Sequence, residues 1–172
     1  MSNPPTQPSL PEPWLRGPLP GVDPLVAPVI ASFTQVREDL ALHMAGLTPE
    51  QIWREAGSAP SLGFHLRHIA GSVDRLMTYL MGDQISSEQI AVLKQEPVPG
   101  ADLDELLGAI DTALTQAEQK LRTIDPATIH EPRGIGRKQL PTSVLGLLVH
   151  IAEHTQRHLG QAITTAKHLR QA

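Results

Sequence analysis

The sequence has no cysteine and very few aromatic residues. Without cysteine, disulfide bonds, thiolate metal ligands and a cysteine nucleophile are excluded, which agrees with the cytoplasmic location that we expect. With only two Trp, one Tyr and two Phe, the core has to be built from Leu, Ile, Val, Ala and Met. An aliphatic core of this kind is typical of a helical bundle.

The sequence also has no long basic run and no long apolar run. The formal net charge is −4 and there is no long basic run, so we expect no nucleic acid partner. No apolar run is long enough to cross a bilayer, and the N-terminus lacks the basic start and apolar centre of a secretory signal. We therefore expect a cytoplasmic chain that has no membrane partner.

The chain divides into a proline-rich arm and one domain. Residues 1–21 contain seven of the prolines, which exclude a helix there, so we predict an extended or disordered arm. Trp14 and Leu15 are the candidates for docking this arm onto the domain. Residues 22–172 have a suitable length for a single domain with a core of its own.

Apolar residues in this domain recur every three or four positions, which is the pattern of amphipathic helices. The long predicted helices span about 23–46, 61–82, 102–122 and 141–168, with short helical turns near 48–53 and 86–94. No alternating strand pattern is evident. The sequence therefore predicts an all-α, four-helix bundle, and its two long middle connections weaken the case for an up-down-up-down hairpin series.

Leu140, Leu147 and Ile151 belong to the inward stripe of the last predicted helix. His154 and His158 continue this stripe at positions where leucine is expected. Residues four apart lie on one face of a helix, and a buried imidazole without a partner costs about 1–3 kcal/mol. A shared metal ion would satisfy one nitrogen of each ring. The structural alternative is a pair of core histidines that are satisfied by hydrogen bonds.

A facing helix can supply a third nitrogen. The helix predicted over 61–82 offers His65 and His68, which share a polar flank with Ser72 and Tyr79. Spacing alone does not rank these two histidines, and either could be a simple surface or interface residue.

Two separated segments resemble one known family. Ser61–Tyr79 (SLGFHLRHIAGSVDRLMTY) is similar to the second helix of the DinB-like (YfiT-like) superfamily of metalloenzymes, and His150–Gln161 (HIAEHTQRHLGQ) is similar to its last helix. The resemblance covers about residues 22–170. It implies a four-helix bundle with up-down-down-up topology, and it implies a homodimer.

The resemblance also indicates which of His65 and His68 is the metal ligand. In the family, the histidine that opens the His-Ile-Ala part of the second helix joins the pair before Gly-Gln in the last helix. Carried over, the metal ligands are His68, His154 and His158, whereas His65 and His150 fall outside this set as groups that could contact a ligand.

Three imidazoles would hold a divalent metal ion, with zinc or nickel expected and iron as an alternative. Such a site keeps an open position at which water or a thiol is acidified. We therefore expect a metal-dependent enzyme that acts on a small molecule by S-transfer or hydrolysis, with a low-molecular-weight thiol as a possible partner. No carboxylate sits at an obvious general-base position beside the ligands, since Glu153 points away from the stripe, and this slightly favours the thiol. No catalytic side chain is assigned.

Four further polar residues could contribute to the site, although each also has an ordinary structural role. Gln161 and Tyr79 could contact a substrate, but a helix-surface amide and an interface residue are the first expectations for them. Arg67 and Arg75 could attract an anion, but a solvated charge is the first expectation for both. The competing function is a non-catalytic, stress-related helical dimer whose metal site is structural or unoccupied.

Overall fold

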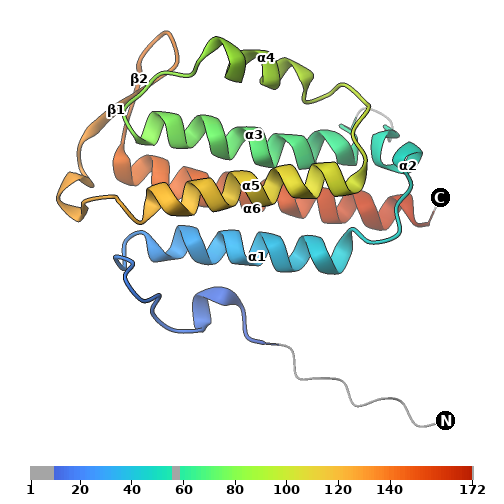
Figure 1. Cartoon of the computed structure of the whole chain (residues 1–172), viewed down its shortest axis with the longest axis horizontal. Helices are drawn as coiled ribbons and strands as arrows, with labels where there is room; N and C mark the ends of the chain where they lie inside the picture. Colours follow the sequence, from blue (N-terminus) through green and yellow to red (C-terminus); the bar gives the residue numbers. More distant parts are fainter. Residues whose placement is uncertain (1–9, 56–58, 172) are drawn as a thin grey trace.

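The computed structural model describes residues 10–55 and 59–171 and places most of them in helices (Figure 1). In chain order the elements are the 3-10 helix η1 (Pro13–Leu15), α1 (Ala27–His43), α2 (Pro49–Trp53), α3 (Leu62–Leu80), α4 (Ser87–Gln95), α5 (Leu103–Leu121), the 3-10 helix η2 (Pro126–Thr128), β1 (Pro132–Ile135), β2 (Leu140–Ser143) and α6 (Val144–Leu169).

The long helices α1, α3, α5 and α6 form a bundle, as predicted. Helix α3 packs on both α5 and α6, and α1 packs on the same two helices from the other side. The colour gradient of Figure 1 shows that α1 and α6 run in one direction and α3 and α5 in the other. Because α3 and α5 are parallel, the chain between them has to cross the length of the bundle, and α4 makes this crossing along α3.

Polar caps fix the starts of the two middle helices where the sequence predicted them. The Ser61 hydroxyl accepts the backbone N–H of Phe64 at 3.1 Å and opens α3. Asp102 accepts the N–H of Glu105 at 2.9 Å, and the Glu105 carboxylate accepts the N–H of Asp102 in return. Such reciprocal caps satisfy N–H groups that have no partner inside the helix.

The core is aliphatic, as the composition requires. Each long helix contributes fully buried side chains, for example Phe33, Leu66, Leu114 and Leu148. Burial of one such side chain stabilises the fold by about 1.5–3 kcal/mol. Within residues 10–55 and 59–171, no helix is both long and apolar enough to cross a membrane.

Two helices begin later than predicted. Helix α1 starts at Ala27, because Asp23 caps a separate turn that precedes it. Helix α6 starts at Val144 rather than Pro141, because residues 140–143 form β2, which pairs antiparallel with β1. Leu140 is therefore 58% exposed on a strand and does not belong to the inward stripe. Four-residue strands are too short to show a clear alternation in the sequence.

The described part of the arm, residues 10–21, lies against α1 through residues other than the predicted ones. Pro13 is buried, and the Arg16 guanidinium donates to both carboxylate oxygens of Glu38, at 2.6 and 2.8 Å. Trp14 and Leu15 are 66% and 56% exposed. The prediction that these two side chains dock the arm is therefore wrong. The exclusion of a helix from the arm is also wrong for residues 13–15, which form the 3-10 helix η1 with a proline at its start.

Candidate metal centre

Three histidines from two distant segments meet between α3 and α6. His68 of α3 faces His154 and His158, which lie one turn apart on α6. Each ring offers one nitrogen, and these three nitrogens lie within 4.8 Å of one another. The ring centroids of His68 and His158 are 4.3 Å apart, and those of His154 and His158 are 4.7 Å apart. The structure thus brings together the three residues that were predicted as metal ligands.

The two α6 histidines lie beside the core rather than inside it. After Ile151 the buried stripe of α6 continues through Thr155 and Leu159, whereas His154 and His158 are only partly buried. The prediction that they occupy core leucine positions is therefore wrong. At about 100° per residue they fall on one flank of the stripe, and the contacts with His68 show that this flank faces α3.

His65 is more deeply buried than His68 and contacts the cluster from the side. It is 4% exposed, and its Nδ1 lies 3.2 Å from Nδ1 of His158. One of these two nitrogens has to carry a proton for the other to accept it. The contact therefore engages Nδ1 of His158 and leaves its Nε2 available, and this position fits the expectation that His65 touches a ligand without being one.

The sequence did not indicate the buried carboxylate of Glu96, which lies beside the cluster. Glu96 follows α4, is 2% exposed, and places Oε2 at 2.7 Å from Nδ1 of His68. Its Oε1 lies 2.8 Å from Nη1 of Arg75, which is 8% exposed. The expectation that Arg75 is solvated is therefore wrong. Glu96 is a carboxylate beside the ligands, but both of its oxygens are engaged, so it does not occupy a general-base position. Glu96 is 28 residues from His68, in a connection with no periodic pattern that could indicate its burial.

Burial lowers the pKa of the clustered histidines. The pKa of His154 is lowered to about 4 and that of His158 to about 3, first because burial disfavours the charged ring and then because His68 would repel the charge. The pKa of His65 is lowered by the same two causes. Near neutral pH these rings are therefore uncharged, with lone pairs available to a cation.

The free energy of unfolding of the metal-free protein should fall as the pH is lowered from about 6.5 to about 4. An unfolded histidine takes up its proton near pH 6.5, whereas folded His154 does so only near pH 4. Acid therefore favours the unfolded chain in this window, and this contribution to stability is fully present above it. Urea unfolding across the window measures the slope. The double variant His154→Gln/His158→Gln should show a flatter dependence, and equal slopes would contradict the burial effect.

The other candidate residues are engaged elsewhere or exposed. Gln161 is exposed, and Tyr79 is 6% exposed within the core. The Arg67 guanidinium donates to the backbone carbonyls of Gln95 and Val98 and so holds the end of the crossing connection. None of these three side chains contributes to the histidine cluster.

A second possible group of ligands occupies one turn of α6. His150, Glu153 and His154 also have ligand atoms within 4.8 Å of one another, but the first two residues are exposed. Glu153 already pairs with His150 at 2.6 Å and with Arg157. The cationic Arg157 competes with a metal ion there, so the cluster that includes His68 is the better cation site.

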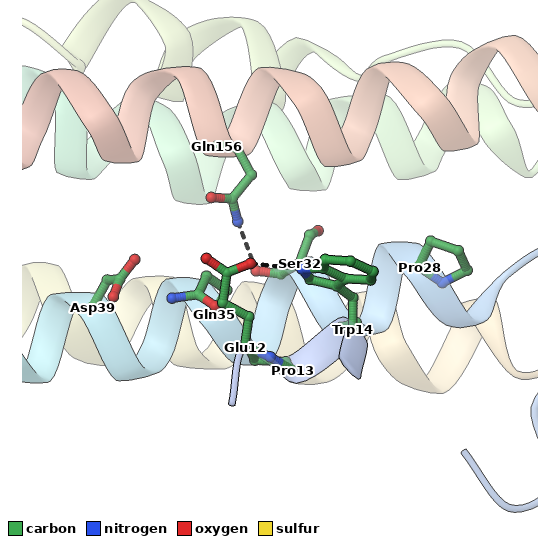
Figure 2. Close-up of a pocket in the computed structure, with 9 residues that line it drawn as sticks. Glu12, Pro13, Trp14, Pro28, Ser32, Gln35, Asp39 and Gln156 are labelled. Atoms are coloured by element: carbon green, nitrogen blue, oxygen red, sulfur yellow. Dashed lines mark hydrogen bonds between the residues drawn. The ribbon is translucent and has the colours of Figure 1, made fainter. Parts of the chain in front are cut away.

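The described arm forms a separate hollow with α1. Figure 2 shows this pocket, which is lined by Glu12 and Trp14 of the arm and by Asp39 and other residues of α1. Its volume is about 410 Å³. Gln156 reaches it from α6 and donates to the backbone carbonyl of Ser32 at 2.9 Å. The lining includes no histidine, so this pocket is separate from the cluster.

The comparison with protein families supports the fold and the motifs together. A family model of the DinB superfamily matches residues 32–162, which include all three clustered histidines. The chain belongs to the DinB superfamily. The DinB match begins in α1 and ends in α6, so it spans the bundle and confirms the resemblance seen in two sequence segments. Comparison with curated proteins gives no match.

The donors of this DinB-type cluster fit a divalent metal ion. Neutral imidazoles are common ligands of zinc, nickel and iron, and donor type does not distinguish among these metals. One nitrogen of each of the three rings lies within 4.8 Å of the other two, which is close enough for the rings to share one ion. The group of three histidines could therefore hold a metal.

Proposed function

We propose that this chain is a metal-dependent enzyme that activates a thiol or water, for S-transfer to a small molecule or for its hydrolysis. The observation that supports this most is the meeting of three imidazole nitrogens from α3 and α6 within 4.8 Å. A divalent ion held there would act as a Lewis acid that lowers the pKa of a thiol or water molecule bound beside it. Closed structural zinc sites normally have four protein ligands, whereas three leave a position open.

The residues around the cluster favour a thiol over water. Glu96 directs one carboxylate oxygen to His68 and the other to Arg75, so it is not free to remove a proton from a water molecule. Phe64 stacks on His68, with centroids 5.3 Å apart and planes 16° apart, and adds an apolar wall. Because the chain has no cysteine, a thiol has to be supplied as a separate small molecule.

The test is metal analysis of protein purified without a histidine tag, followed by assays with low-molecular-weight thiols and small electrophiles. We expect about one divalent ion per chain, and thiol consumption that stops when a chelator removes the ion and resumes when the metal is restored. Hydrolysis of a small ester without thiol serves as the parallel assay for water. Protein that binds no divalent metal under any of these conditions would contradict the proposal.

The second candidate is a non-catalytic, stress-related helical dimer. It is favoured by the short contacts among the rings themselves, since Nε2 of His68 lies 2.9 Å from Nε2 of His154, a distance that a hydrogen bond also explains. A hollow of about 420 Å³ between α1 and α6, lined in part by Leu25, Leu145 and Val149, offers apolar surface to a second copy. A dimer in solution whose stability is unaffected by added metal or chelator would favour this candidate.

A further inference from the structure

A buried carboxylate contacts the imidazole of His68 at the ring nitrogen that does not face His154. Glu96, the C-cap residue of α4, is 2% exposed, and its Oε2 lies 2.7 Å from Nδ1 of His68. Its Oε1 faces Nη1 of Arg75 at 2.8 Å, as an ion pair outside hydrogen-bond geometry. A charge buried this far requires compensation. Arg75 supplies it and leaves Oε2 to accept a hydrogen bond from His68.

The position of the proton on His68 decides which nitrogen can bind a metal ion. A carboxylate can only accept, so this contact places the proton on Nδ1 and leaves the lone pair on Nε2, the atom that faces His154. We propose that Glu96 is the positioning residue for His68, that Arg75 holds it in place, and that Glu96 couples the crossing helix α4 to metal occupancy. The inference rests on the proposed function, because it requires His68 to be a ligand. Carboxylates commonly orient metal-bound histidines in this way.

Gly71 provides the space for this ion pair. It lies inside α3, where glycine is about 1 kcal/mol less favourable than alanine. A Cβ atom at this position would lie 2.5 Å from Oε1 of Glu96 and 2.7 Å from Nη1 of Arg75. The absence of a side chain at Gly71 thus leaves room for the carboxylate that contacts His68.

Helix α4 depends on such contacts for its place on the bundle. None of its nine residues, all described, is buried. Gln89 ties its first turn to Asp74 and Thr78 of α3, and Glu96 ties its end to the histidine cluster. An ion that fixes the ring of His68 would therefore restrain Glu96 and, with it, the end of α4.

Two substitutions of Glu96 test the positioning role. In Glu96→Leu the acceptor is lost, and we expect the affinity of the metal-free protein for Zn²⁺, measured by competition with a chelator, to fall about 10- to 100-fold. Glu96→Gln keeps an oxygen that accepts a hydrogen bond and should lose less. The nitrogen NMR signals of His68 in the metal-free protein should report protonation at Nδ1 in the wild type and a mixture of tautomers in Glu96→Leu. Glu88→Gln, an exposed change on α4, is the control.

A matched pair of glycine variants tests the same unit without removing any polar group. Gly71→Ala should displace the ion pair and weaken Zn²⁺ binding. Gly160→Ala, also inside a helix but with no atom within 4 Å of the added Cβ, should leave Zn²⁺ affinity unchanged. Because both glycine variants keep Glu96 and Arg75, their comparison tests the role of the ion pair even if Glu96→Leu folds poorly.

Hydrogen exchange tests the coupling to α4. The amides of Glu96 and Val98 donate to the carbonyls of Leu93 and Gln95, and their protection should increase when Zn²⁺ is added to the wild type but not to Glu96→Leu. Equal Zn²⁺ affinity and equal tautomer signals in the wild type and Glu96→Leu would overturn the role of Glu96 alone. A wild-type protein that binds no metal would instead overturn the proposed function, while the tautomer signals would still test the contact between Glu96 and His68.

Discussion

His154→Ala together with His158→Ala should abolish stoichiometric metal binding while most of the helix content remains. The double variant leaves His68 as the single remaining ligand of the cluster, and one imidazole does not hold an ion in competition with water and buffer. Alanine is the best helix former, and the buried stripe of α6 through Thr155 and Leu159 is untouched. The fold should therefore survive the loss of the site.

Elemental analysis of tag-free protein measures the metal content, and far-ultraviolet circular dichroism measures the helix content. His168→Ala removes an exposed histidine near the end of α6 and should leave the metal content unchanged. The double variant His150→Ala/Glu153→Gln removes the exposed alternative ligands and should also keep the metal. Full metal stoichiometry in His154→Ala/His158→Ala would refute the assignment of the cluster.

The bundle follows from periodicity and capping, which are local properties of the sequence. A stripe of apolar residues at spacings of three and four identifies a helix, and residues such as Ser61 and Asp102 mark where the helices begin. The hairpin that contains Leu140 was missed because its strands are only four residues long. Burial on the flank of a stripe, as for His154 and His158, depends on which neighbouring helix covers that flank.

The predictable residues of the candidate site are those that a short-range sequence pattern or the family resemblance identifies. The spacing of His154 and His158 places both rings on one side of α6, whereas the choice of His68 over His65 came from the resemblance. Glu96 carries no such signal, since it lies in the crossing connection and its burial depends on how α4 packs along α3. That placement is a tertiary property, set by contacts between residues far apart in the sequence.

Arg75→Met should lower the free energy of unfolding by about 3–5 kcal/mol, because it leaves a buried carboxylate without its counter-ion. The side chains of Glu96 and Arg75 are 2% and 10% exposed, so little water reaches the pair. A loss of this size is a large part of the roughly 5–15 kcal/mol by which domains are stable. Urea unfolding of the metal-free protein measures it, with Arg122→Met, an exposed change just after α5, as the control.

The double variant Arg75→Met/Glu96→Met separates stability from metal binding. Replacing both members of a buried ion pair by apolar residues is often neutral or stabilising, so the double variant should recover most of the stability that Arg75→Met loses. Its affinity for Zn²⁺ should nevertheless stay low, because His68 has lost the acceptor that fixes its tautomer. Recovery of both properties together would mean that the pair serves only the packing of α4, whereas recovery of stability alone is the result expected if Glu96 positions a metal ligand.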